Sequence, residues 1–252
     1  MKTTKILLAL IFISLFKSSF GQEEKNFASA NDFYQKKEYH KAINIYNSLL
    51  FNGQQSYEIF YNLGNCWYKL DNYPKAILYY EKAKKIDNSD EDLNYNLNVA
   101  NTKISDKIEV IPVFFLKKWW LQFQNIFSEK QWALVSIIFW IFTSLGAYLF
   151  FTTRKFIVKS ISFWAGVTML IISFITGFAG YNKYKESTQN NSAIVMTAAV
   201  NVKSSPEEES TIIFVIHQGT KVNLALKIND WYKIKLANGS TGWIKEEDLE
   251  II

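Results

Sequence analysis

Two stretches near the middle of the chain carry no charged residue, and they restrict its possible folds more than any other feature. Residues 132–151 are WALVSIIFWIFTSLGAYLFF, and residues 161–181 are ISFWAGVTMLIISFITGFAGY. As helices rising about 1.5 Å per residue, each would be about 30 Å long, the thickness of the hydrocarbon core of a bilayer. The alternative is a pair of helices buried in a soluble core, but no other hydrophobic segment is large enough to surround them. We therefore expect two transmembrane helices, at 131–151 and 161–181.

The first 21 residues have the three parts of a secretory signal peptide. Lys2 and Lys5 precede an apolar run that is too short to span a membrane, and the small residues Ser19 and Gly21 follow at the positions recognised by signal peptidase. We expect cleavage after residue 21. The alternative is an uncleaved anchor, because Lys17 and Phe20 make the cleavage site imperfect.

The loop between the two apolar stretches, 152–160, contains Arg154, Lys155 and Lys159 and no acid. The positive-inside rule places such a loop in the cytoplasm. Lysines also flank the outer ends of both stretches, so the signal peptide decides the orientation. The sequence predicts a two-pass membrane protein. Residues 22–130 and 182–252 would lie outside the cytoplasm, with 182–192 as a polar linker.

The segment 106–130, which precedes the first span, interleaves aromatic residues with lysines. Trp119 and Trp120 are amphipathic side chains of the kind that favour the headgroup level of a bilayer. We interpret this segment as an interfacial amphipathic helix. An ordinary packing helix against a soluble domain is the alternative.

The N-terminal third of the chain repeats itself with a period of 34 residues. The recurring pairs are Phe33 and Trp67, Tyr39 and Tyr73, Lys41 and Lys75, Ala42 and Ala76, Ile43 and Ile77, and Tyr46 and Tyr80. The segment from Tyr57, IFYNLGNCWYKLDNYPKAILYYEKAKKID, resembles a tetratricopeptide repeat (TPR), with small residues at Gly64 and Ala76 where two helices cross closely. Two repeats and a solvating cap helix from Glu91 would occupy residues 22–105.

The TPR resemblance implies a concave surface that binds peptides or helices. The polar residues expected to line it, our candidate partner-binding residues here, are Asn31, Tyr34, Asn62, Asn65 and Tyr68. Phe27 and Tyr61 stand where peptide-clamping members of the family carry cations, which argues against a clamp for a terminal carboxylate. The alternative is that these polar side chains form a solvated face.

From residue 193 the pattern changes from helical to alternating, as in VNLAL at 222–226 and YKIKL at 232–236. Asn238-Gly239 between two alternating runs is a strong hairpin signal. Residues 193–252 resemble a bacterial SH3 (SH3b) domain, although Lys203 replaces the usual arginine. Trp231 and Trp243 could form an exposed aromatic binding edge, or each could close the barrel core.

Composition and motifs exclude several functions. The formal charge of +5 falls to +2 without the three lysines of the signal peptide, and no dense basic stripe of a nucleic-acid binder appears. The single cysteine, Cys66, lies among apolar neighbours and is interpreted as a buried inert thiol. His40 and His217 are too far apart to suggest a metal site. No catalytic motif or cofactor fingerprint is present, so we expect neither an enzyme nor a bound cofactor.

The sequence therefore predicts a multi-domain chain: an all-α TPR array, two transmembrane helices and a small all-β SH3-like barrel. This domain order resembles the BatE-like proteins of Bacteroidetes aerotolerance operons. The resemblance implies a non-enzymatic scaffold of the bacterial cytoplasmic (inner) membrane, with both domains on the periplasmic side. Its protein partners would be other membrane proteins of the same operon, linked to oxidative or envelope stress. The alternative is an envelope protein that binds peptidoglycan through its SH3b domain.

Overall fold

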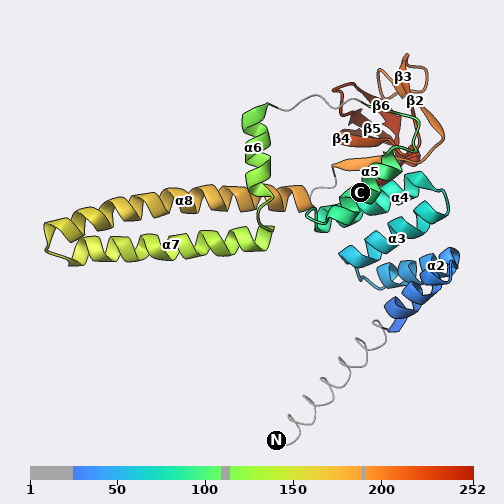
Figure 1. The fold of residues 1–252 in the computed structure, drawn as a ribbon. Helices are drawn as coiled ribbons and strands as arrows, with labels where there is room; N and C mark the ends of the chain where they lie inside the picture. Colours follow the sequence, from blue (N-terminus) through green and yellow to red (C-terminus); the bar gives the residue numbers. More distant parts are fainter. Residues whose placement is uncertain (1–24, 109–113, 189–190) are drawn as a thin grey trace, which may run out of the picture. The chain divides into compact units, whose positions relative to one another are not determined.

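The computed structural model describes residues 25–108, 114–188 and 191–252, so the predicted signal peptide lies outside it. The chain divides into two compact units. One combines the segments before and after the apolar hairpin, and the other comprises residues 112–190. The expected fold class is confirmed: a helical repeat array, two long apolar helices and a C-terminal antiparallel β-domain (Figure 1).

The helical array begins with a helix over residues 25–35. It continues with α2 (Tyr39–Phe51), α3 (Tyr57–Lys69), α4 (Tyr73–Ile86) and α5 (Glu91–Asn101). The side chains of Ser56, Asn72 and Asp90 cap α3, α4 and α5 by accepting a hydrogen bond from a first-turn backbone N–H. A Cβ at Gly64 would lie 2.4 Å from the Tyr80 ring, which shows why the helix crossing needs glycine.

The β-domain is a seven-stranded antiparallel sheet in the order β3-β2-β6-β5-β4-β1-β7. The strands are β1 (Ser192–Val195), β2 (Ala199–Lys203), β3 (Ile212–His217), β4 (Lys221–Ile228), β5 (Trp231–Lys235), β6 (Thr241–Lys245) and β7 (Leu249–Ile251), with a short 3-10 helix at Glu246–Asp248 before β7. Alternate residues of these strands, such as Val202, Ile234 and Ile244, form its buried core.

The hairpin predicted at Asn238-Gly239 joins β5 to β6, but its turn differs from the two-residue form. Only Gly239 has a positive φ, at 85°, and the Leu236 N–H donates to the Ser240 carbonyl at 2.9 Å. The loop therefore holds three residues, the longer class in which one glycine supplies the left-handed conformation.

The repeat array and the β-domain share hydrophobic core, a contact that the sequence did not predict. Ala193 and Val195 of β1 point into the barrel core. Ile194, between them, is fully buried in the cluster of the repeats with Ile77 and Leu78 of α4. Because neighbouring residues of a strand face opposite sides, one strand serves both cores. The barrel thus covers part of the array, where a solvating cap helix alone was expected.

Polar contacts reinforce this joint. Asp106, just after α5, accepts hydrogen bonds from the His217 backbone N–H at 2.6 Å and from Thr220 Oγ1 at 2.8 Å. The His217 ring Nδ1 lies 2.7 Å from Oδ1 of Asp106, the second oxygen of that carboxylate. Glu81 of α4 pairs with Lys221 of β4 at 2.7 Å. The carboxylate of Asp106 thereby ties the end of the array to the β3–β4 turn.

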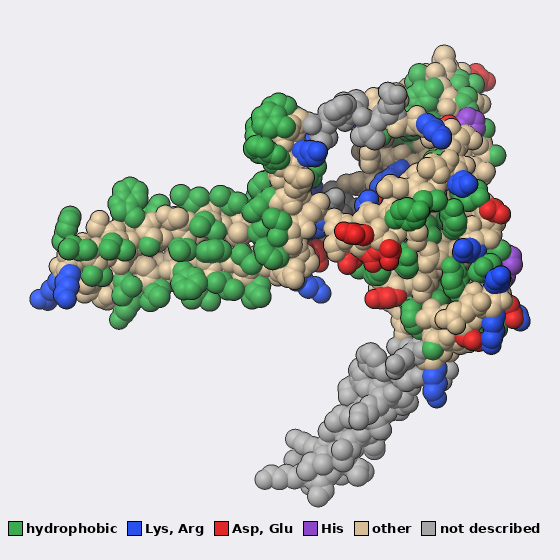
Figure 2. Space-filling model, in the orientation of Figure 1, with side chains coloured by type: hydrophobic (Ala, Val, Ile, Leu, Met, Phe, Trp, Pro, Cys, Tyr) green, Lys and Arg blue, Asp and Glu red, His purple; other side chains and the backbone are tan. Residues whose placement is uncertain are grey.

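The second unit is an apolar helical hairpin made of α7 (Glu129–Thr152) and α8 (Phe156–Thr188). Both helices are long and apolar enough to cross a membrane, and only 6% and 17% of their apolar windows are buried. Within the described chain they are therefore not buried as the core helices of a soluble domain are. Figure 2 shows hydrophobic side chains over the outside of the pair and basic ones at its tip. This distribution is compatible with a membrane anchor.

Small and hydroxyl-bearing residues fill the contact between α7 and α8. A Cβ on Gly146 would lie 3.2 Å from Gly166 Cα, so the two backbones approach closely there. Ser136 Oγ donates to the Ser173 carbonyl at 3.0 Å, and Ser173 Oγ donates to the Ser136 carbonyl at 3.1 Å. Such contacts hold helices together in lipid, where large apolar side chains gain nothing by turning inward.

Helix α6 (Phe115–Gln124) precedes α7 and crosses the hairpin instead of running alongside it (Figure 1). Its inward ring, Trp120, lies 5.8 Å from that of Phe178 on α8. The indole N–H of Trp132, which is 2% exposed, donates to the Gln124 carbonyl at 2.9 Å. Trp119, in contrast, is 64% exposed. Helix α6 thus has one face packed on the hairpin and one exposed face, and its position in a membrane interface stays a prediction.

Two predicted boundaries need correction. The linker predicted at 182–192 is helical through Thr188, because residues 182–188 contain no proline or glycine and Lys and Glu favour helix. The loop predicted at 152–160 shrinks to residues 153–155, since α8 begins at Phe156. Hydropathy marks where apolar character ends, whereas the helical backbone continues beyond it.

Candidate functional site

The first candidate surface lies on the array and is built from four half-buried asparagines, which we call the amide strip: Asn31, Asn62, Asn65 and Asn96. They come from the first helix, from α3 and from α5. The strip therefore crosses from each repeat to the next. Three of its members were predicted as partner-binding residues, and Asn96, on the helix after the second repeat, was not.

Each half of the strip is bonded to a tyrosine of a neighbouring helix. Asn31 Oδ1 accepts from the Tyr46 hydroxyl at 2.5 Å and from Asn62 Nδ2 at 3.1 Å. Asn65 Oδ1 accepts from the Tyr80 hydroxyl at 2.8 Å and from Asn96 Nδ2 at 3.3 Å. The second half thus repeats the bonding of the first.

The tyrosines of these bonds are core residues. Tyr46 is 0% exposed and Tyr80 is 1% exposed, and burial raises the pKa of both hydroxyls. A buried hydroxyl without an acceptor would cost about 1–3 kcal/mol, so Asn31 and Asn65 also stabilise the array. The sequence contained this signal, because both partners recur with the same 34-residue period.

The aromatic candidates lie at the flanks of the strip. Tyr34 and Tyr68 are half-buried and pack against Tyr39 and Tyr73, with ring centroids 5.5 and 5.6 Å apart. Tyr61 accepts a hydrogen bond from Asn96 at 3.0 Å. The amide strip and its flanks therefore present amide and phenol groups.

Cys66 lies on α3 and is 0% exposed. Burial raises its pKa to about 12, so the thiol is protonated at neutral pH and inert, as the sequence indicated. Within the described residues, no group of His, Cys, Asp or Glu side chains could hold a metal ion.

The second candidate surface is the outer face of the barrel, which we call the basic face: Lys203, Lys233, Lys245, Trp231 and Trp243. Register places these side chains together, because Trp243 is opposite both Lys203 and Lys233, and Trp231 is opposite Lys245. Trp243 is 8% exposed, whereas Trp231 is half-buried. Of the two predicted tryptophans, Trp231 is the more accessible.

Two lysines of the basic face lie over the ring of Trp231. Their ammonium nitrogens, from Lys203 and Lys245, are 5.3 and 5.8 Å from its centroid. The Lys203 side chain is 13% exposed, so its ammonium is held in place. Lys203, where related domains usually have arginine, is thus a central member of this face.

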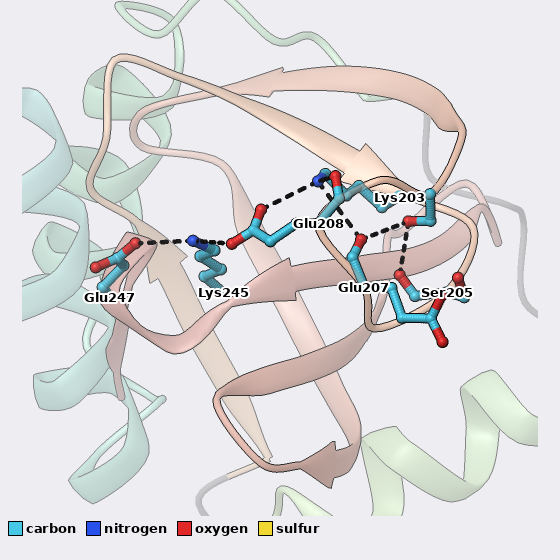
Figure 3. A network of polar contacts seen from close by, with 7 residues as sticks. Lys203, Ser205, Glu207, Glu208, Lys245 and Glu247 are labelled. Atoms are coloured by element: carbon cyan, nitrogen blue, oxygen red, sulfur yellow. Dashed lines mark hydrogen bonds and ion pairs between the residues drawn. The ribbon is translucent and has the colours of Figure 1, made fainter.

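The loop 205–210, which we call the acidic loop, contacts these lysines through Glu208 (Figure 3). One carboxylate oxygen of Glu208 pairs with Lys245, and the other lies 3.3 Å from Lys203 Nζ. Hydrogen bonds from Lys245 and then Lys203 lower the pKa of Glu208. The sequence did not predict this contact, because nothing local indicates what the loop folds against.

Comparison with known families agrees with both domains. Residues 198–250 match the family model of the bacterial SH3 domain, and residues 57–90 match that of the tetratricopeptide repeat. No curated protein matches the chain. The chain therefore combines a tetratricopeptide repeat with a bacterial SH3 domain, two modules that typically mediate interactions without catalysis.

Proposed function

We propose that this protein is a non-enzymatic scaffold of the bacterial inner membrane that holds protein partners on the periplasmic side. The hairpin would anchor it, α6 would lie in the membrane interface, and the array and barrel would bind partners. The BatE-like domain order supports membrane proteins of the same operon as the partners, in an aerotolerance or envelope-stress complex.

The observation that carries this proposal is the shared core at Ile194. The array precedes the hairpin in the chain and the barrel follows it, yet both belong to one compact unit. Two parts of a chain that share a core must lie on the same side of a membrane. A two-span hairpin between them satisfies this condition, and the predicted signal peptide would place that side outside the cytoplasm.

Cysteine labelling with a membrane-impermeant maleimide in spheroplasts tests the topology. In a Cys66→Ser background, we expect Ser89→Cys on the array and Asn238→Cys on the barrel to be labelled in intact spheroplasts. Lys155→Cys in the hairpin loop should be labelled only after lysis. Labelling of Ser89→Cys and Asn238→Cys on opposite sides would refute the proposed topology.

Crosslinking in native membranes, followed by mass spectrometry of the purified full-length protein, tests the scaffold function. We expect crosslinks from the array or the barrel to other membrane proteins. The yield of these crosslinks is then compared between variants. Tyr34→Ala and Tyr68→Ala change the flanks of the amide strip, and Tyr95→Ala, at a residue of α5 that is 69% exposed, is the control. Absence of any protein crosslink from either domain would contradict a scaffold.

The bacterial SH3 match and the accessible Trp231 favour one other function, tethering to peptidoglycan. In that case, the full-length protein in detergent would sediment with purified peptidoglycan, and Trp231→Ala would release it. A protein that remains in the supernatant contradicts tethering and leaves the scaffold as the proposal.

A further inference from the structure

The acidic loop is itself a short acidic peptide that lies against the basic face of the barrel. Its sequence is Ser205-Pro206-Glu207-Glu208-Glu209-Ser210. Lys203 Nζ donates to the backbone carbonyl of Glu208, lies 3.5 Å from that of Glu207, and contacts the Glu208 carboxylate. The lysine therefore recognises main-chain and side-chain oxygens together, as a peptide-binding group does.

We propose that the basic face is a binding site for an acidic peptide segment of a protein partner, and that the acidic loop occupies this site until the segment displaces it. The inference rests on the proposed scaffold function and adds the chemistry that selects the partner. A neutral glycan strand is the weaker fit, because it has no carboxylate to replace that of Glu208 between Lys203 and Lys245.

The ion pairs of the loop reach two of the three lysines of the basic face. Glu208 pairs with Lys203 and Lys245, and Glu247 lies 3.7 Å from Lys245. Lys233, in register with Trp243 on the same face, has no ion pair within the described parts of the chain. An incoming segment with two or more acidic residues can therefore reach a cation that the loop leaves unused.

The carboxylate contacts of the loop are weak enough to be exchanged. The Glu208 side chain is 64% exposed, and ion pairs between exposed groups contribute little in water. Glu207 and Glu209 are exposed as well. The loop competes mainly through its tether, which gives a short segment an effective concentration in the millimolar range. Neutralising the loop should therefore strengthen the binding of a free acidic peptide.

Fluorescence anisotropy with the full-length protein in phosphatidylcholine nanodiscs tests this. The probe is a labelled Ser-Pro-Glu-Glu-Glu-Ser hexapeptide with blocked ends, and its control replaces each Glu with Gln. We expect the variant Glu207→Gln/Glu208→Gln/Glu209→Gln to bind the acidic probe about three- to tenfold more tightly than the native chain. Added salt should weaken this binding, because exposed charges are screened.

Two further variants, made in the neutralised-loop background, test the lysines. Lys203→Gln/Lys245→Gln should abolish the gain in affinity, whereas Lys36→Gln, an exposed lysine of the array, should leave it unchanged. Circular dichroism verifies that each variant is folded.

Several results would overturn the proposal. They are equal affinity of native and neutralised-loop proteins, equal binding of the control hexapeptide, and no binding to the neutralised variant up to about 5 mM, a typical effective concentration for a short tether. Binding of soluble peptidoglycan fragments in place of the hexapeptide would assign the site to a glycan. Hexapeptide binding without protein crosslinks in native membranes would instead contradict the scaffold and leave this site intact.

Discussion

The amide strip of the array and the basic face of the barrel both present polar side chains to a partner, but their polar groups are bonded in opposite ways. In the strip, Asn31 and Asn65 accept hydrogen bonds from tyrosines that are almost completely buried. On the basic face, Glu208 joins two lysines while largely exposed. Buried polar bonds are costly to break, whereas exposed ion pairs are exchanged cheaply. The strip is therefore committed to the fold, and the basic face is free to change partner.

The largest effect should follow from removing a buried ring beneath the strip. Tyr80→Ala should lower the free energy of unfolding by about 3–5 kcal/mol, because it opens a cavity and removes the shorter of the two hydrogen bonds that Asn65 Oδ1 accepts. Urea titration in detergent, followed by the loss of helical ellipticity, measures this. The control Tyr95→Ala should cost less than about 0.5 kcal/mol. Equal losses in the two variants would mean that Tyr80 does not support the strip.

A smaller loss should follow from removing the acceptor alone. Asn65→Ala should lower the free energy of unfolding by about 1–3 kcal/mol, since the Tyr80 hydroxyl stays buried without a partner. In a Tyr80→Phe background the same change should cost clearly less, because no hydroxyl is left unpaired. The exposed Asn98→Ala serves as control. An unchanged stability of Asn65→Ala would return Asn65 to a purely partner-binding role.

The joint between array and barrel should respond to acid through Asp106. Partial burial raises its pKa, but hydrogen bonds from the backbone and ring of His217 and from Thr220 outweigh this, so the net pKa is lowered. Stability from a lowered carboxyl pKa is present above the unfolded value of about 3.9 and is lost as pH falls through the folded value.

The protein with Asp106 should therefore lose stability below about pH 4, and the Asp106→Asn variant should lack this loss. At neutral pH we expect Asp106→Asn to lower the free energy of unfolding by about 1 kcal/mol, the net contribution of a typical hydrogen bond. Limited proteolysis between array and barrel at pH 7 and pH 3.5 is the measurement. Identical pH profiles for the two proteins would remove Asp106 from the joint.

The smallest effect should come from the basic face. Glu208→Gln should leave the melting temperature unchanged, because its carboxylate is exposed and its ion pairs are screened by water. Differential scanning calorimetry in nanodiscs tests this beside Asn65→Ala. A marked loss of stability in Glu208→Gln would make the acidic loop structural and end the contrast between the two surfaces.

Local physical rules determined much of this molecule from the sequence. The period of 34 residues required two helices per repeat, and the small residues Gly64 and Ala76 allowed them to cross. Alternation from residue 193 required strands, and uncharged runs of membrane length required an apolar hairpin. Each of these signals depends on residues that are neighbours in the chain, so no tertiary information is needed to recognise them.

The tertiary structure alone decided which distant surfaces meet. Ile194 looks like any apolar strand residue, yet it completes the core of a domain that lies on the other side of the hairpin in the chain. Asp106 and His217 are bonded across more than one hundred residues, and Glu208 contacts Lys203 and Lys245 only because strands β2 and β6 are paired. Such contacts depend on the packing of whole elements. An apolar or charged side chain can pack against or pair with many others, and only the folded geometry selects which one it contacts.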